Sequence, residues 1–211
     1  MNNGWIGTDE AGKGDYFGPL VIAGVYVNEA HVSELSRLHV RDSKRISDAK
    51  VKRLARELRK VCPHNIVAIG PEKYNQLYNR IRNLNRLLAW GHARVIENLL
   101  ETVSCSRAIS DQFGDKQYLL KALMKKGKQI ELEQRTQAED DIAVAAASII
   151  ARAEFLTRLK QISEQWSIDL PKGATSVIQA GRTFVRQHGR ESLPQVAKIH
   201  FKTTRAITAT P

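Results

Sequence analysis

The chain has 211 residues, of which 42% are hydrophobic and 26% are charged, a balance typical of folded globular proteins. Its 33 Lys and Arg residues against 22 Asp and Glu give a formal net charge of +11, which favours a polyanionic partner. Charge alone does not separate nucleic acid from an acidic membrane surface. No apolar stretch approaches the roughly 20 residues of a membrane span, so we expect no membrane partner.

Length and composition favour one α/β domain over residues 1–211, ending from about residue 165 in a C-terminal helical segment and basic tail. The first residues lack the charged and apolar regions of a signal peptide. Cys62 and Cys105 have the spacing of neither a zinc site nor a disulfide framework. We therefore expect buried thiols in a reducing cytoplasm. No obligate protein partner is evident, and we expect a monomer.

The first motif is Asp9-Glu10-Ala11-Gly12-Lys13-Gly14, which follows a short apolar run and precedes a second one at 20–27. Because a strand turns successive side chains to opposite faces, we expect a tight turn to bring both carboxylates to one site. Gly12 and Gly14 supply backbone freedom for such a turn. The pattern favours a strand–turn–strand unit that holds two acids at the edge of a cleft.

A phosphate-binding P-loop is the alternative interpretation of this motif. Gly7, Gly12 and Lys13 satisfy its spacing, but Gly14 occupies the position where Ser or Thr must bind magnesium. Two carboxylates would also oppose phosphate in a loop that binds through bare N–H groups. We therefore disfavour it. Two solvated acids in a polar turn are the other alternative, which the flanking apolar runs disfavour.

Further along the chain, hydrophobic periodicity and capping residues predict alternating helices and strands. Ser47 is the expected cap of the first helix. The later elements are a strand at 65–70, helices at 71–82 and 83–103, a strand at 108–111, a helix from Asp115 to Gly127, a strand at 129–134, a buried helix at 142–151 and an amphipathic helix at 177–185. The expected basic tail holds Lys198, His200, Lys202 and Arg205. Asn79, Asn83 and Asn85 either cap helix ends or bind sugar and phosphate oxygens.

Two further acids occur where elements meet. Asp111 ends a predicted strand, where α/β folds gather ligands. Glu139, Asp140 and Asp141 precede the buried helix. Capping and the helix dipole explain Asp140 and Asp141, but explain Glu139 less well because it precedes the first turn.

Together, Asp9, Glu10, Asp111 and Glu139 suggest metal chemistry. Four carboxylates in one cleft repel one another unless cations lie between them, and oxygen ligands suit Mg²⁺ or Mn²⁺. Two such ions stabilise in-line displacement at phosphorus. In a basic protein, this yields the hypothesis of nucleic-acid hydrolysis. The residue pattern alone does not establish that the four acids converge.

The motifs closely resemble the type 2 ribonuclease H family, and its ribonuclease HIII branch in particular. The match runs in order through nearly the whole chain, in the segments Asp9–Pro19, Asp42-Ser43-Lys44, Asn83–Ala93, Asp111-Gln112-Phe113, Ala138-Glu139, Ile142–Arg152, Leu170–Ala174 and His200-Phe201-Lys202. The resemblance implies a ribonuclease H-like five-stranded mixed sheet flanked by helices. It also implies endonucleolytic cleavage of the RNA strand in RNA/DNA hybrids, leaving 5′-phosphate and 3′-hydroxyl ends.

By the same resemblance, Asp9, Glu10, Asp111 and Glu139 are the catalytic acids that bind two Mg²⁺ or Mn²⁺ ions. The backbone of Gly12-Lys13-Gly14 is expected to read the ribose 2′-hydroxyl, which distinguishes RNA from DNA. Expected phosphate contacts are Ser43, Lys44 and Lys172. The alternatives are cleavage at single ribonucleotides in DNA, a nuclease or recombinase acting on DNA, and a non-catalytic hybrid-binding module.

Two departures from the family pattern affect substrate binding. Proteins of the HIII branch usually carry an N-terminal substrate-binding domain, whereas here the motif begins at Asp9, so hybrid binding is expected to rest on the catalytic domain and its basic surface. The HII branch uses a C-terminal tyrosine at RNA–DNA junctions, and the last tyrosine here is Tyr118. We therefore expect weak or no cleavage at a single embedded ribonucleotide.

Overall fold

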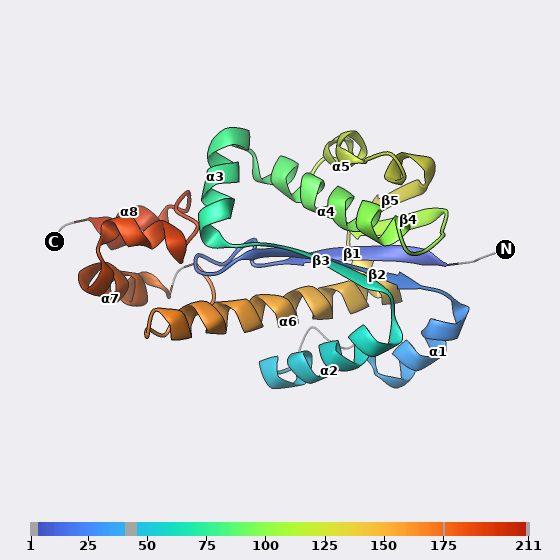
Figure 1. Ribbon diagram of the computed structural model, residues 1–211, viewed down its shortest axis with the longest axis horizontal. Coiled ribbons are helices and arrows are strands. Elements are labelled where there is room, and N and C mark those ends of the chain that lie inside the picture. The colour runs from blue at the N-terminus through green and yellow to red at the C-terminus, as the bar shows by residue number, and fades with distance from the viewer. Residues whose placement is uncertain (1–3, 41–45, 175, 210–211) are drawn as a thin grey trace. The chain divides into compact units, whose positions relative to one another are not determined.

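Five strands form one mixed sheet in the order β3-β2-β1-β4-β5 (Figure 1). Their bounds are Trp5–Ala11 for β1, Leu20–Val27 for β2, His64–Ile69 for β3, Arg107–Asp111 for β4 and Glu131–Arg135 for β5. Strand β1 pairs antiparallel with β2 and parallel with β4, and β4 pairs parallel with β5. The computed structural model describes residues 4–40, 46–174 and 176–209. It confirms the expected five-stranded mixed sheet.

The expected helices occur in the expected order, and α1 and α8 are present in addition to them. Their bounds are Glu29–Arg37 (α1), Asp48–Val61 (α2), Pro71–Ile81 (α3), Leu84–Leu100 (α4), Lys116–Ala122 (α5), Ile142–Gln165 (α6), Ile178–His188 (α7) and Thr203–Thr208 (α8), with 3₁₀ turns at Gly127–Gln129 (η2), Ala138–Asp140 (η3) and Arg190–Gln195 (η4). Ser47, Asn83 and Asp115 cap α2, α4 and α5 through their side chains. Helix α5 ends at Ala122 rather than at Gly127. No described helix is long and apolar enough to cross a bilayer.

The chain divides into two compact units. We call the first the sheet unit, formed by Met1–Ala11, Val21–Val67 and Asn83–Glu154. The second unit consists of Gly12–Leu20, Ala68–Arg82 and Phe155–Pro211. That the whole chain acts as a single domain stays a prediction.

Within the sheet unit, helices pack closely on both faces of β1 and β2 (Figure 1). On one face, a Cβ at Gly24 of β2 would lie 2.3 Å from Cγ1 of Val95 in α4. On the other face, a Cβ at Gly7 of β1 would lie 2.2 Å from the backbone of Ala143 in α6. Both glycines therefore permit a helix to approach the sheet more closely than a side chain would allow. Strand β1 is thus enclosed between α4 and the start of α6.

Candidate active site

Asp9 and Glu10 are the ninth and tenth residues of the chain and lie inside β1, which continues to Ala11. The turn follows β1 and does not set the positions of the two acids, because the strand continues through both and its alternation points them to opposite faces of the sheet. Glu10 faces α4, whereas Asp9 faces α6. The expected strand–turn–strand unit is present, with the acids at the end of its first strand.

Strand β2, not a helix, follows the turn. The structure therefore excludes a P-loop, in which the glycine-rich loop must open a helix. Gly7 lies in β1 and serves the close packing of α6 rather than phosphate binding.

Glu10 is held by a buried histidine on α4. Nε2 of His92 lies 3.1 Å from Oε2 of Glu10, and Nδ1 lies 2.9 Å from Oγ1 of Thr8. The imidazole is fully buried and stacks on the ring of Phe113, with a centroid distance of 4.8 Å. Both ring nitrogens and one ring face are therefore occupied, which fixes the orientation of the imidazole and of the carboxylate beside it.

The carboxylate of Asp9 lies where its ionised form is disfavoured. Burial, then the Glu10 carboxylate and more weakly the Asp111 carboxylate raise the pKa of Asp9 to about 7. Hydrogen bonds from the Ser148 side chain and the Glu10 backbone N–H, the latter 2.8 Å from Oδ1, act in the opposite direction. The net effect is that burial and the neighbouring carboxylates disfavour the ionised form of Asp9.

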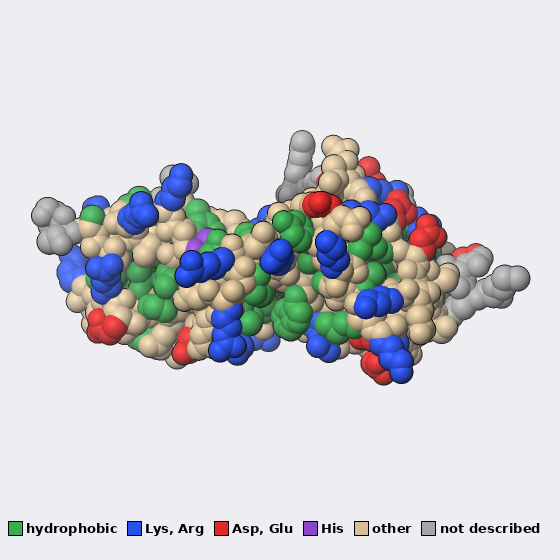
Figure 2. Space-filling view, turned by 90° about the horizontal axis from the view of Figure 1, so that it is seen from above, with side chains coloured by type: hydrophobic (Ala, Val, Ile, Leu, Met, Phe, Trp, Pro, Cys, Tyr) green, Lys and Arg blue, Asp and Glu red, His purple; other side chains and the backbone are tan. Residues whose placement is uncertain are grey.

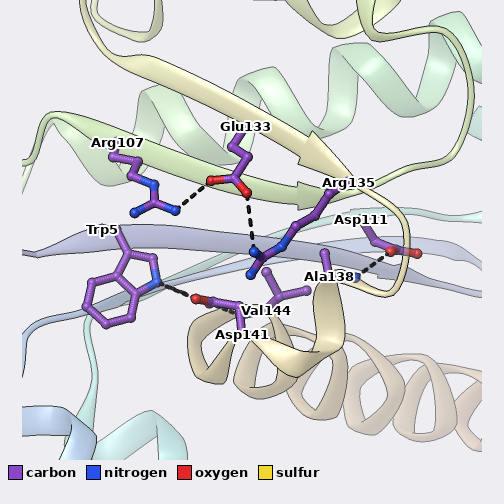
Figure 3. A network of polar contacts seen from close by, with 8 residues as sticks. All are labelled: Trp5, Arg107, Asp111, Glu133, Arg135, Ala138, Asp141 and Val144. Carbon is purple, nitrogen blue, oxygen red and sulfur yellow. Dashed lines mark hydrogen bonds and ion pairs between the residues drawn. The ribbon is translucent and has the colours of Figure 1, made fainter.

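Asp111 reaches the same end of the sheet because β4 runs parallel to β1. Thr8 pairs with Ser110, and Asp9 and Asp111 are the next residues of the two strands, so they lie at matching positions. The backbone N–H of Ala138 donates to Oδ1 of Asp111 at 3.0 Å, which joins the start of η3 to the end of β4 (Figure 3). Glu139 is the next residue of η3.

The start of α6 is fixed by a separate acid. Oδ1 of Asp141 accepts hydrogen bonds from the backbone N–H groups of Ala143 and Val144 at 2.9 and 3.2 Å. The indole N–H of Trp5 also donates to this carboxylate at 3.1 Å (Figure 3). Asp141 therefore caps the helix, as its position in the sequence suggests.

A divalent cation fits this group of acids by ligand chemistry. The carboxylates of Asp9, Glu10, Asp111 and Glu139 offer only oxygen, which suits Mg²⁺ and Mn²⁺. The pKa of Asp9 is raised first by burial and then by repulsion from Glu10 and, more weakly, from Asp111. In the described part of the chain, no group of three or more His, Cys, Asp or Glu side chains is already arranged to hold a metal ion. Metal binding by these four acids is therefore a proposal.

The turn that links β1 to β2 belongs to the second unit, where a buried lysine holds it. Nζ of Lys198 donates to the backbone carbonyls of Asp15 at 2.7 Å, Gly18 at 2.8 Å and Phe17 at 3.5 Å. Burial lowers the pKa of Lys198 to about 7, and the Asp15 carboxylate acts in the opposite direction. The placement of Lys198 in an exposed basic tail is wrong, because its side chain is fully buried.

The same turn is joined to residues near Lys172, one of the predicted substrate contacts. The backbone N–H of Gly173 donates to Oδ1 of Asp15 at 2.7 Å, and its carbonyl accepts from the backbone N–H of Tyr16 at 2.8 Å. Lys172 is exposed beside this pair of hydrogen bonds. Gly12 has φ of +85°, and a Cβ there would lie 2.2 Å from the carbonyl oxygen of Pro19. Gly12 is therefore required by the turn.

Four further residues were predicted to contact the substrate, and the structure describes two of them. Lys13 is partly exposed and Gly14 is exposed. Ser43 and Lys44 lie outside the described residues. None of these positions has a demonstrated ligand, so their roles stay predictions.

Sequence reasoning missed the roles of His92 and Lys198. For His92 a signal exists, because it occupies the apolar stripe of α4 between Leu88 and Ile96, each four residues away. A polar residue on a buried stripe needs hydrogen-bond partners. For Lys198 no local signal exists, since its acceptors lie about 180 residues earlier in the chain.

Comparison with known proteins identifies this arrangement. The family model described as Ribonuclease HII matches residues 6–204. A protein named Ribonuclease HIII from Protochlamydia amoebophila is 49% identical over 203 residues, covering 96% of this chain and 67% of the relative. One from Chlamydia pneumoniae is 48% identical over 202 residues, covering 94% of this chain and 68% of the relative.

Among solved structures, the Mn²⁺ complex of Bst-RNase HIII superposes with a TM-score of 0.90 at 31% identity, covering 98% of this chain and 69% of that chain. The fold and the acids at the ends of β1 and β4 thus define a ribonuclease H-type hydrolase. The chain belongs to the ribonuclease HII family, in which its similarity is to the ribonuclease HIII branch.

Proposed function

We propose that this protein hydrolyses the RNA strand of RNA/DNA hybrids and leaves 5′-phosphate and 3′-hydroxyl ends. The observation that carries the proposal is the placement of Asp9, Glu10 and Asp111 at the ends of two neighbouring parallel strands, where burial first and then the other two carboxylates raise the pKa of Asp9. A group of carboxylates that repel one another has the electrostatics of a cation site. Family membership supplies the substrate class for such a site.

In this proposal, Asp9, Glu10, Asp111 and Glu139 hold the divalent ions. Two bound Mg²⁺ or Mn²⁺ ions would activate the attacking water and neutralise the leaving oxygen. The protein positions the carboxylates: His92 orients Glu10, the Ser148 side chain binds Asp9, and the backbone of Ala138 binds Asp111. Each acid is therefore supported by a different partner before any ion binds.

Recognition of RNA is proposed for the turn of Gly12, Lys13 and Gly14. A Cβ at Gly14 would have no heavy atom within 4 Å, so the backbone is open to a ligand on this side. A backbone without side-chain cover can come close enough to a ribose to bind its 2′-hydroxyl. Lys172, Ser43 and Lys44 are proposed to contact phosphates.

The test compares cleavage of matched RNA/DNA, RNA/RNA, DNA/DNA and single-ribonucleotide duplexes with Mg²⁺, with Mn²⁺ and with EDTA. We expect cleavage of the RNA strand of the hybrid with at least one metal and no cleavage with EDTA. Binding without cleavage under every metal condition would identify a hybrid-binding module instead. Efficient incision at a single ribonucleotide would contradict the expected weakness of that reaction, which rests on the missing C-terminal tyrosine.

A further inference from the structure

A pocket of about 540 Å³ lies between the first turn of α4 and helix α5, within the sheet unit. It is lined by Arg86, Asp115, Gln117, Tyr118, Lys121 and Ala122. Its size is in the range of sites that hold a small ligand or a single nucleotide unit. Arg86 lies in the Asn83–Ala93 segment that resembles the ribonuclease HIII branch, but the proposed function gives none of the pocket residues a role.

The cations of this pocket lack carboxylate partners. Among the described residues, no Asp or Glu forms an ion pair with Arg86 or with Lys121, and both side chains are exposed. The carboxylate of Asp115 lines the pocket but accepts a hydrogen bond from the backbone N–H of Gln117 at 2.9 Å as the cap of α5. The lining therefore carries two cations and one carboxylate, which leaves a net positive charge.

Some other arginines of the sheet unit are paired, whereas Arg53, Arg56 and Arg94 form no ion pair with a described Asp or Glu. Arg59 binds Glu154 and Arg152 binds Asp48, each at 2.8 Å, and Arg107 binds Glu133 (Figure 3). These ion pairs distinguish structural arginines from Arg86, whose guanidinium instead lies 5.9 Å from the ring centroid of Tyr118. An aromatic ring holds a guanidinium in place while leaving its N–H groups available.

The pocket lies at the same end of the sheet as the acids. Asp111 ends β4, and four residues later Asp115 begins the wall of the pocket. Phe113 of this connection stacks on His92, which also contacts Glu10. A Cβ at Gly114 would lie 2.7 Å from Nδ2 of Asn85, next to Arg86. The connection thus holds the pocket against the segment of α4 that lies about two turns before His92.

We propose that Arg86, Tyr118 and Lys121 form a subsite for a backbone phosphodiester of the nucleic acid, beside the site of cleavage. The inference rests on the proposed function, because it takes the hybrid as the ligand. A guanidinium fork and an ammonium group bind phosphate oxygens by charge-assisted hydrogen bonds. The view onto α4 and α5 shows Lys and Arg side chains interspersed with apolar ones on this face, a surface suited to a polyanion (Figure 2).

General electrostatics is the competing explanation, since the loss of any cation weakens binding of nucleic acid to a protein of charge +11. The chain offers matched controls. Arg94 is exposed on the same helix as Arg86 but does not line the pocket, and Lys125 lies four residues beyond Lys121, also exposed and outside it. A subsite predicts that Arg86 and Lys121 differ from these controls, whereas general electrostatics predicts that all four behave alike.

The first experiment measures binding of an RNA/DNA hybrid by fluorescence anisotropy in EDTA, in an Asp9→Asn background that prevents cleavage. We expect Arg86→Ala and Lys121→Ala each to weaken binding about ten-fold and to reduce the salt slope by about one. Arg94→Ala and Lys125→Ala should weaken it about two-fold. Thermal unfolding of each variant checks that it is folded. Equal losses in the pocket and control variants would overturn the subsite.

The second experiment maps the phosphate. Binding is measured for a series of hybrids that each carry one neutral methylphosphonate, at successive positions. The Asp9→Asn protein serves as the reference protein and is compared with the same protein carrying Arg86→Ala. The subsite predicts one position where the modification weakens binding by the reference protein but has no further effect on Arg86→Ala. If the two losses add at every position, no phosphate is bound there and the proposal fails.

A separate cleavage assay keeps the two proposals apart. Failure of the wild-type protein to cleave the hybrid with any metal would contradict the proposed function. Cleavage by the wild type, together with equal binding by the pocket and control variants, would contradict the subsite alone.

Discussion

Nε2 of His92 lies 3.1 Å from Oε2 of Glu10, and the imidazole that makes this contact has no exposed surface. The other ring nitrogen contacts Thr8, two residues before Glu10 on the same face of β1. The carboxylate of Glu10, near the end of the central strand, is therefore oriented by a buried histidine of α4. Because both partners of this contact belong to the protein, we expect its loss to change the orientation of Glu10 directly.

Replacement of His92 by Leu should reduce both divalent-metal affinity and kcat by roughly 10- to 100-fold, as is typical when a residue that orients a ligand is lost. His92→Gln retains an amide N–H that can reach Glu10 and should recover part of both losses. Calorimetric titration with Mn²⁺ measures the affinity apart from turnover. Wild-type affinity and kcat in His92→Leu would show that the contact does not position Glu10.

Asp9→Asn should abolish cleavage and leave binding of the hybrid largely intact. In EDTA it should also change the pH dependence of stability. The pKa of Asp9 is raised from its ordinary value of 3.8 to about 7, so the native state keeps a proton that the unfolded state loses between those values. This carboxyl therefore lowers stability progressively as pH rises from about 4 to 7, and the cost is fully present above 7.

We expect Asp9→Asn to unfold at a temperature a few degrees higher than the wild type at pH 8 in EDTA, with the difference declining towards pH 4. Thermal unfolding followed by circular dichroism at several pH values measures this. A difference that is independent of pH would argue against a raised pKa for Asp9.

Gly14→Ala separates recognition of substrate from folding. The added methyl group has no heavy atom of the protein within 4 Å, so the unfolding temperature should stay near that of the wild type. If the turn approaches a ribose, the methyl group should raise KM for the hybrid, by about ten-fold. Gly70→Ala is the control, because a Cβ there also meets nothing within 4 Å. If both variants have the same KM as the wild type, Gly14 does not contact the substrate.

Lys198→Met tests the buried lysine that holds the turn. The substitution removes the donor to the carbonyls of Asp15 and Gly18, and each unsatisfied buried carbonyl costs about 1–3 kcal/mol. The free energy of unfolding in urea should fall by at least that amount. Lys202→Met, at an exposed position nearby, should stay within about 0.5 kcal/mol of the wild type. Equal values for the two variants would show that Lys198 does not stabilise the turn.

The elements with strong local signals could be predicted. Continuous apolar runs predicted β2 and the first half of α6, and side chains with capping chemistry marked the starts of α2, α4 and α5. Helix α1 was not predicted although the side chain of Asn28 caps it, because Leu35 is its one buried residue and its apolar pattern is therefore weak. Propensity and periodicity report burial along one element, so a short helix with little buried surface escapes them.

The candidate site was predictable in its residue types and in part of its placement. Asp111 at a strand end was predicted, because parallel strands gather ligands at their carboxyl ends. The orientations of Asp9 and Glu10 were not, since they depend on how far β1 continues. The burial of Lys198 follows from contacts between distant segments, which no local pattern contains.

Because side chains alternate along β1, Asp9 and Glu10 are held by residues of two different helices. Glu10 depends on α4 through His92, and Asp9 depends on α6 through Ser148. A substitution in either helix can therefore change the hydrogen bonding of one acid while its neighbour in the sequence keeps its own partner. Mutational tuning of the two acids should be additive when the changes are confined to opposite faces of the strand, and coupled only when Asp9 or Glu10 itself is replaced.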